Sequence, residues 1–288
     1  MRWERAKNLI IVFLVVTNVV LAVLINIETE VHNLTVERET ALNVVLANNN
    51  IILGNELVRN FSPMRDLQLD NYNYDVDQLL EMFFPPNARI SHLTDANFDE
   101  FYWENSRLTI SNGYIAFVAG HDIIGVPEVA AAAEITQTFI DTYYPNFILD
   151  INSTRLARRG GLRVFYRQEY QGQIIHTNFV EFLVTSDNAD TIVIEEVDIQ
   201  YGVPLGFVYL PQNLVGSDEA LLTFMQNIRM QNAETILINH MDIAYFQTMS
   251  GLREGYFPTN VYAVPFYRIF VEGYESPFLI NAQTNQMF

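Results

Sequence analysis

The sequence predicts an α+β protein that follows a single N-terminal transmembrane helix. Three observations lead to this prediction: a long apolar stretch near the start, helical patterns that recur along the chain, and β-rich runs separated by turn residues. Helices that alternate with groups of antiparallel strands pack on one face of a sheet. We therefore expect helices packed on antiparallel β-sheets, in repeated helix-plus-meander units.

The apolar stretch NLIIVFLVVTNVVLAVLI covers residues 8–25, and the polar residues in its interior are Thr17 and Asn18. As a helix that rises about 1.5 Å per residue, it would extend roughly 25 Å, which is enough to span a bilayer. Basic residues precede the stretch and acidic residues follow it, and positive charge stays on the cytoplasmic side. We expect residues 1–7 in the cytoplasm, a single span at residues 8–25, and an extracellular remainder anchored in the cell membrane.

A cleaved signal peptide is the alternative, because it shares a basic start and an apolar core with an anchor. Cleavage requires small residues spaced as in A-x-A just after the core. The exit here reads LAVLINIETE, in which Ala22 is followed by bulky or polar residues. The stretch is therefore expected to be retained as an anchor.

Residues 26–125 are expected to contain a juxtamembrane helix and a first α+β domain. The segment ETALNVVLANNN places apolar residues at helical spacing. The segment NYDVDQLLEMFFPP predicts a second helix, acidic in its first turn and ended by two prolines. Two β-rich runs then flank Asn112 and Gly113, which is the strongest short signal for a β-hairpin.

Residues 126–288 are expected to form a second α+β domain with two helix-meander units. The first unit begins with the helix VPEVAAAAEITQTFIDTYY, followed by four β-rich runs with turn signals between them. The second begins with the helix DEALLTFMQNIRM, capped by Ser217, and continues with three β-rich runs. The repeated order of a helix and then strands suggests an internal structural repeat.

Charge and cysteine content exclude several classes of protein. From residue 26 onward the chain keeps all of its 16 basic residues except Arg2, Arg5 and Lys7, and all of its 34 acidic residues except Glu4, for a net charge of about −20. A field of that sign repels nucleic acid, so no nucleic-acid partner is expected. The chain contains no cysteine, so it has neither disulfides nor thiolate chemistry.

No catalytic, cofactor-binding or metal-binding motif is found, and we expect a protein that is not an enzyme and needs no cofactor. The sequence lacks H-E-x-x-H, C-x-x-C, G-x-S-x-G and phosphate-binding glycine loops. Two histidine and carboxylate pairs, His121 with Asp122 and His240 with Asp242, have the minimal composition for general-base catalysis. They support a weaker hydrolase hypothesis, because such pairs also arise by chance.

The polar residues inside the apolar stretch predict a contact between membrane helices. An amide in hydrocarbon is costly without a partner, and a hydrogen bond to another helix contributes roughly 0.5–2 kcal/mol. Alternatively, Thr17 bonds to its own backbone four residues back and Asn18 is tolerated. The expected partner-binding face comprises Ile11, Leu14, Thr17, Asn18, Ala22 and Ile25.

The segment TRLARRGGLRVFYR is the one basic cluster of the chain. It could bind an acidic partner surface through bidentate contacts. In the alternative interpretation it is a solvated hairpin whose arginines pair with carboxylates of the protein itself. The residues concerned are Arg155, Arg158, Arg159, Arg163 and Arg167.

The opening MRWERAKNLIIVFLVVTNVVLAVLI resembles that of YycI-type (WalI) proteins, with Trp3, Arg5 and Lys7 just before the anchor. The closing segments VPFYRIFVEG and PFLINAQTNQ resemble the closing strands of that family, although the family more often has a Trp-Arg pair where Tyr267 and Arg268 stand here. YycI-type proteins are membrane-anchored, non-enzymatic regulators of the YycG/WalK two-component system in low-GC Gram-positive bacteria. The resemblance implies partnership with that cell-wall-sensing histidine kinase and with a YycH-type protein, chiefly through transmembrane helices, and it supplies no catalytic residue.

The leading hypothesis is therefore a single-pass regulator that binds other membrane proteins. The alternative is an anchored extracellular module that binds or inhibits a peptide or a wall fragment. The sequence identifies neither the sensed signal nor the direction of regulation.

Overall fold

The structure is a computed structural model, and it confirms the α+β class. It describes residues 7, 10–11, 13–21, 32–55, 57–95, 98–111, 113–121, 125–187, 191–228, 235–247 and 261–288. Most neighbouring strands are antiparallel, and helices pack against them.

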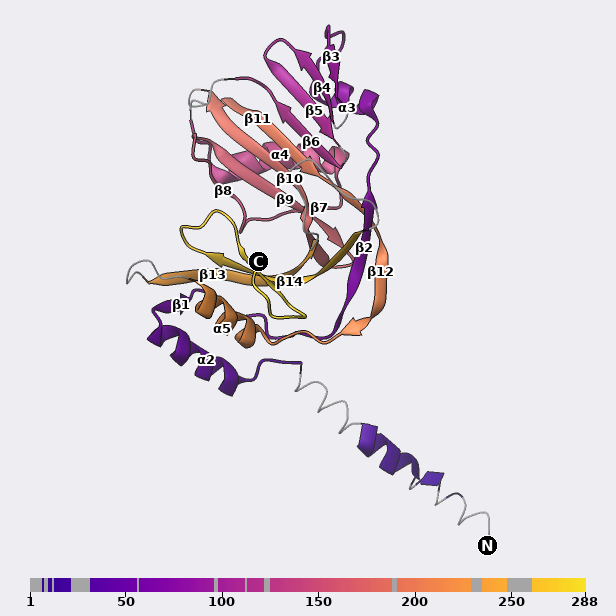
Figure 1. The fold of residues 1–288 in the computed structure, drawn as a ribbon, viewed down its shortest axis with the longest axis vertical. Coiled ribbons are helices and arrows are strands. Elements are labelled where there is room, and N and C mark those ends of the chain that lie inside the picture. Colours follow the sequence, from indigo (N-terminus) through magenta and orange to yellow (C-terminus); the bar gives the residue numbers. More distant parts are fainter. Residues whose placement is uncertain are drawn as a thin grey trace.

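Among the described residues, fifteen strands belong to one hydrogen-bonded sheet. Figure 1 shows an upper group of strands around β4, β5 and β11, and a lower group around β13 and β14. The main path, in sheet order, is β12 (Gly202–Gln212), β2 (Met64–Asn71), β14 (Val261–Val271), β13 (Ile236–Gln247), β10 (Gln173–Asp187), β11 (Thr191–Gln200), β6 (Tyr114–Val118), β5 (Ser106–Ser111), β4 (Phe98–Trp103) and β3 (Ser91–Thr94). The strands off this path are β1 (Ile51–Leu53), β7 (Phe147–Leu149), β8 (Arg155–Leu156), β9 (Leu162–Tyr170) and β15 (Phe278–Asn281).

Four helices that pack on the sheet match predicted helical segments: α2 (Val36–Asn48), α3 (Val76–Phe83), α4 (Val129–Tyr143) and α5 (Ser217–Asn227). Side-chain caps explain where two of them begin. Thr35 accepts a hydrogen bond from the backbone N–H of Arg38 at the start of α2, and Asp75 caps the start of α3 in the same way. The prediction for α5 was wrong in one detail: its N-cap is Gly216, and the Ser217 hydroxyl instead donates to the Val58 carbonyl at 2.6 Å.

The order of a helix and then strands occurs twice, as predicted. Helix α4 leads into β7 to β11, and α5 leads into β13 to β15. The hairpin predicted at Asn112 and Gly113 is confirmed by the antiparallel pairing of β5 with β6. The sheet is not divided at residue 125, however, because β6 pairs with β11 and β2 pairs with β14.

The meanders are not purely antiparallel. Strand β1 pairs with β13 in parallel, and a short parallel ladder joins Ile174 of β10 to Ala244 of β13. This second ladder hydrogen-bonds the two helix-meander units to each other. The prediction of antiparallel meanders is therefore correct within each unit, but the two units are joined by parallel pairing of β10 with β13.

Two main hydrophobic clusters hold the helices to the sheet. One lies between α2, α5 and the strands β1, β13, β14 and β15, where Phe224 of α5 is fully buried. The other lies between α3, α4 and the strands of the upper group, where Ile140 of α4 and Phe182 of β10 are fully buried. With no disulfide in the chain, burial of these side chains is the main term that favours folding.

The N-terminal stretch is described only in part. Residues 10, 11 and 13–21 are helical and lie apart from the body in Figure 1. Among the described residues, no helix has the length and apolar character needed to cross a membrane. The rest of the stretch predicted at 8–25 lies outside the described residues.

Candidate functional site

The predicted helix-contact face lies partly within the described residues. Ile11 and Leu14 are 48% and 54% exposed, and Asn18 is exposed as well. The Thr17 hydroxyl donates to the carbonyl oxygen of Phe13 at 2.9 Å, which is the alternative considered for this residue. Asn18 is therefore the member of the polar pair on which a contact with another helix would depend. The two remaining residues of the predicted face, Ala22 and Ile25, lie outside the described residues.

The His240 and Asp242 pair is tied into the structure by an arginine. His240 Nε2 lies 3.5 Å from a carboxylate oxygen of Asp242. The same carboxylate accepts two hydrogen bonds from Arg268, at 2.7 Å from Nε and 2.5 Å from Nη2. Burial opposes ionisation of Asp242, but hydrogen bonds from His240 and Arg268 outweigh it and lower the pKa of Asp242. A carboxylate held in this way is a weak proton acceptor.

The second predicted pair is described only at His121. Its backbone N–H and that of Gly120 donate to the Glu195 carboxylate, each at 3.1 Å. Asp122 lies outside the described residues. Within the described ranges, no group of three or more histidine, aspartate or glutamate side chains could hold a metal ion.

The arginine hairpin is formed by β8 and β9, and two of its members pair with the protein's own carboxylates. Arg163 bonds to Glu181 and, at 3.0 Å, to Glu196. Arg158 bonds to Glu275, although its side chain is 85% exposed. These pairs agree with the interpretation of the cluster as a self-paired hairpin.

Two other arginines of the hairpin differ in their surroundings. The guanidinium of Arg155 lies over the Phe165 ring, 4.7 Å from its centroid, and donates to the carbonyl oxygen of Ser153. Arg159 is exposed, and no ion pair with another described residue is found for it. Binding of an acidic partner at this hairpin stays a prediction, with Arg159 as its most accessible charge.

Arg167, the fifth arginine of the predicted cluster, lies in a buried charge cluster with Asp150, Arg268 and Asp242. Arg268 Nη1 donates to Asp150 at 2.8 Å, and Arg167 Nε donates to the same oxygen at 3.4 Å. The backbone carbonyl of His176 accepts a further bond from Arg167. These residues come from β9, β10, β13, β14 and the loop after β7, so the cluster links the two helix-meander units.

Charges in this cluster compensate each other. Burial lowers the pKa of Arg167 to about 10, with Asp150 opposing the shift. Burial also lowers the pKa of His176 well below its usual value, and the two neighbouring arginines add to the effect. His176 is therefore neutral at physiological pH, and two arginines face two aspartates. The balance of two charges of each sign indicates a structural role for the cluster.

Asp198 lies near Arg163, and ionisation of its buried side chain at neutral pH destabilises the folded state. Burial raises its pKa to about 6, while a 2.7 Å hydrogen bond from Tyr114 works in the opposite direction. An unfolded aspartate titrates near 3.9, so folding stability is expected to fall as pH rises from about 4 to about 6.

Replacing this carboxylate should expose that pH dependence. We expect Asp198→Asn to raise the midpoint of urea unfolding at pH 7.5 and to change it little at pH 4, because the amide resembles the protonated acid. Urea unfolding of both chains at the two pH values measures this. A gain in stability that is equal at pH 4 and pH 7.5 would contradict the assignment.

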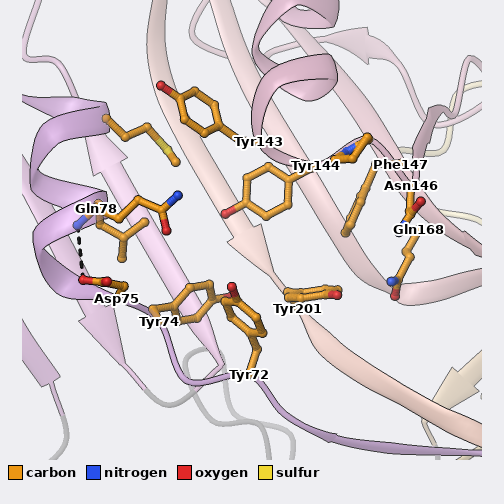
Figure 2. A pocket seen from close by; sticks show the side chains of 13 residues that line it. Tyr72, Tyr74, Asp75, Gln78, Tyr143, Tyr144, Asn146, Phe147, Gln168 and Tyr201 are labelled. Carbon is orange, nitrogen blue, oxygen red and sulfur yellow. Dashed lines mark hydrogen bonds between the residues drawn. The ribbon is translucent and has the colours of Figure 1, made fainter.

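A cavity of about 150 Å³ lies between α3 and the C-terminal end of α4, and aromatic side chains form much of its lining (Figure 2). We call it the tyrosine pocket. In Figure 2, Tyr143 lies above the Tyr144 ring, Tyr72, Tyr74 and Tyr201 lie below it, and Gln78 extends from α3 on the left. The aromatic residues that line the pocket are Tyr72, Tyr74, Tyr143, Tyr144, Phe147 and Tyr201.

These rings form a continuous aromatic surface. The centroid of Tyr72 lies 4.9 Å from that of Tyr74 and 4.8 Å from that of Tyr201. Tyr201 is in turn 5.8 Å from Phe147 and 6.4 Å from Tyr144. Such separations are typical of favourable aromatic pairs, so the walls are preformed.

The hydroxyl groups of the pocket are more unusual than its rings. The Tyr74 hydroxyl is buried, and no hydrogen-bond partner for it is found among the described residues. Burial raises the pKa of Tyr74 well above its usual value, and the neighbouring hydroxyls of Tyr144, Tyr201 and Tyr72 raise it further. Burial likewise raises the pKa of Tyr144. The phenols of Tyr74 and Tyr144 are therefore neutral and can donate hydrogen bonds near physiological pH.

A buried amide network fixes one wall of the pocket. Asn178 donates to Gln168 at 2.6 Å and to the Gly202 carbonyl at 2.7 Å, and it accepts from the Gly202 N–H at 3.1 Å. The Gln168 side chain also hydrogen-bonds to the Tyr201 hydroxyl. Gln168 of β9 therefore holds the Tyr201 hydroxyl, and Asn178 of β10 holds the backbone of the next residue, Gly202.

No single segment of the sequence predicts this pocket. Its residues come from α3, from β7 and β9, and from the ends of β2, α4 and β11, which are far apart along the chain. The available signal was the position of the tyrosines: Tyr72 and Tyr74 precede a helix, Tyr143 and Tyr144 end one, and Tyr201 separates two strands. Their convergence became visible only with the fold.

Neither a protein-family model nor a curated protein sequence matches the chain. Among solved structures, a similar chain is described as an uncharacterized protein from Eubacterium rectale ATCC 33656, in a crystal structure at 1.45 Å resolution. The two chains share 10% sequence identity with a TM-score of 0.46, over 83% of this chain and 90% of that chain. This level of similarity supports no inference about the function of the present chain.

Proposed function

We propose that the protein is a non-enzymatic, single-pass membrane regulator of a cell-wall-sensing histidine kinase. It acts through contacts with the kinase and with a YycH-type partner, largely within the membrane. Residues 1–7 are cytoplasmic, residues 8–25 span the membrane, and the acidic α+β body is extracellular. The resemblance of the opening and closing segments to YycI-type proteins supports this proposal.

The observation that carries the proposal is the row of exposed apolar side chains on the N-terminal helix. Phe13 is 67% exposed and Val19 is 58% exposed, and the other large apolar residues that the structure describes between Ile10 and Leu21 are 48–59% exposed. Exposed apolar surface of this extent is normally covered by lipid or by another protein. Asn18 lies on the same helix and can give the contact specificity.

Asn18→Leu is expected to weaken co-purification of the full-length chain with the histidine kinase and the YycH-type protein. A hydrogen bond between membrane helices contributes roughly 0.5–2 kcal/mol, so recovery of the partners should fall about twofold or more. Quantitative pull-down from solubilised membranes measures the change.

Thr17→Val is the matched control, because the Thr17 hydroxyl already bonds to Phe13 within its own helix. We expect this variant to retain its partners. Unchanged association of Asn18→Leu, or an equal loss in both variants, would count against the proposed contact.

The tyrosine pocket favours a second candidate function, in which the anchored body binds a peptide or a wall fragment. A preformed concave site with aromatic walls and a few polar groups is the usual form of a small-ligand site. In this case the body would bind its ligand in the absence of the kinase. The first function depends on the N-terminal helix and the second on the body, so they can be tested separately.

A further inference from the structure

We propose that the tyrosine pocket binds a single neutral sugar ring, a pyranose with or without an N-acetyl group. This inference rests on the second candidate function and names its ligand class. Three properties of the pocket carry it: the size of the cavity, the neutral polar groups in its wall, and the buried Tyr74 hydroxyl.

The cavity holds one ring. A volume of about 150 Å³ is close to that of an engineered protein cavity that binds benzene, and it is smaller than the sites of drug-sized ligands. A pyranose unit of a longer chain could enter with its neighbours outside. Entry is possible from the side of Tyr143, which is 39% exposed, and Asn146, which is exposed.

The walls match a molecule that is apolar on its faces and polar at its edge. A pyranose presents C–H groups on its faces, and the electron-rich faces of tyrosine rings attract them. The amides of Gln78 and Asn146 and the tyrosine hydroxyls can both donate and accept hydrogen bonds. Sugar hydroxyls do the same, so each group at the ring edge can find a partner.

The charge of the pocket favours a neutral ligand. Among the described residues that line it, no lysine, arginine or histidine is present to bind an anion. The single carboxylate, Asp75, already accepts hydrogen bonds from the backbone N–H groups of Asp77 and Gln78 at 3.1 and 3.3 Å. Neither an anionic nor a cationic ligand would find a dedicated charge partner.

The Tyr74 hydroxyl points independently to a ligand. A buried polar atom without a partner destabilises the folded state, and such groups are rare unless a water or ligand satisfies them. Tyr74 lines the cavity, so a small rotation of its ring on ligand binding would bring this hydroxyl to a sugar hydroxyl that supplies the missing acceptor. A proline ring, the other common occupant of aromatic grooves, brings no donor for the amide oxygens of Gln78 and Asn146.

Titration of the full-length chain tests the proposal. The chain is held in lipid nanodiscs without any sugar detergent, and glucose, N-acetylglucosamine and a proline-rich peptide are the probes. Saturation-transfer NMR should show saturable binding of at least one sugar. Tyr74→Phe should weaken that binding about threefold to tenfold, since one hydrogen bond is lost. The same variant should unfold at an unchanged or higher temperature, because it removes the unpaired hydroxyl.

Two further variants complete the experiment. Tyr72→Ala removes part of the aromatic wall and should abolish sugar binding, whereas Tyr262→Phe, on exposed β14 surface away from the pocket, should leave it unchanged. If the peptide binds and neither sugar does, the proposal of a sugar ligand is wrong, but the second candidate function, ligand binding by the body, is supported. If none of the three probes binds, the sugar ligand and the second candidate function are both overturned. The proposal for the N-terminal helix is tested separately through Asn18.

Discussion

Arg268→Ala is expected to lower the free energy of unfolding by about 3–5 kcal/mol, because it breaks a buried ion-pair network. Arg268 is 1% exposed and binds Asp242 through two nitrogens and Asp150 through a third. Its removal would leave Asp242 without its arginine and Asp150 with Arg167 alone. The two helix-meander units would lose the buried Arg268–Asp150 ion pair that joins them. Denaturant unfolding of the full chain measures the effect.

The matched control for this prediction is Arg158→Ala. Arg158 also pairs with a carboxylate, but it is 85% exposed, so its loss should change stability by less than about 1 kcal/mol. The double variant Arg268→Ala with Asp242→Ala should lose less unfolding free energy than the sum of the losses in the two single variants, because no aspartate is left without its arginine. Additive effects would show that Arg268 and Asp242 do not act as a pair.

Phe182→Ala is expected to cost about 3–5 kcal/mol of unfolding free energy by creating a cavity. Phe182 lies on β10 beneath α4, with no exposed surface. Its ring makes edge contacts with Phe139 at 5.3 Å and with Tyr166 at 5.9 Å between centroids. The loss should therefore loosen α4 first, which hydrogen exchange of the α4 amides can detect.

Leu156→Ala serves as the comparison for the core variant. Leu156 is 67% exposed on β8, so removal of its side chain leaves no cavity, and stability should change by less than about 0.5 kcal/mol. If Phe182→Ala were no more harmful than Leu156→Ala, the packing between α4 and the sheet would be contradicted.

Local signals in the sequence predicted most of the individual elements. The acidic first turn of α3 and the hairpin at Asn112 and Gly113 depend on neighbouring residues alone, so they could be recognised without the fold. Strand β12 was missed because Pro204 and Gly206 are typical of a loop. At the edge of the sheet they are tolerated, since irregular pairing between these two residues accommodates them.

The connections between distant elements could not be predicted from the sequence. The parallel ladder of β10 with β13 has no local signature, and it brings Asp150 and Arg167 next to Arg268. Arg167 was consequently grouped with the hairpin arginines, although it is buried in another cluster. The tyrosine pocket escaped prediction for the same reason, because its rings meet only after four separate elements are assembled.

The most direct test of the central claim concerns the N-terminal helix. Full-length chain and a variant whose residues 8–25 are replaced by a polyleucine span are compared by pull-down from membranes. The proposal predicts that the polyleucine variant still enters the membrane but loses the histidine kinase and the YycH-type protein. Retention of both partners by the variant would contradict it and would assign the regulatory contact to the acidic body.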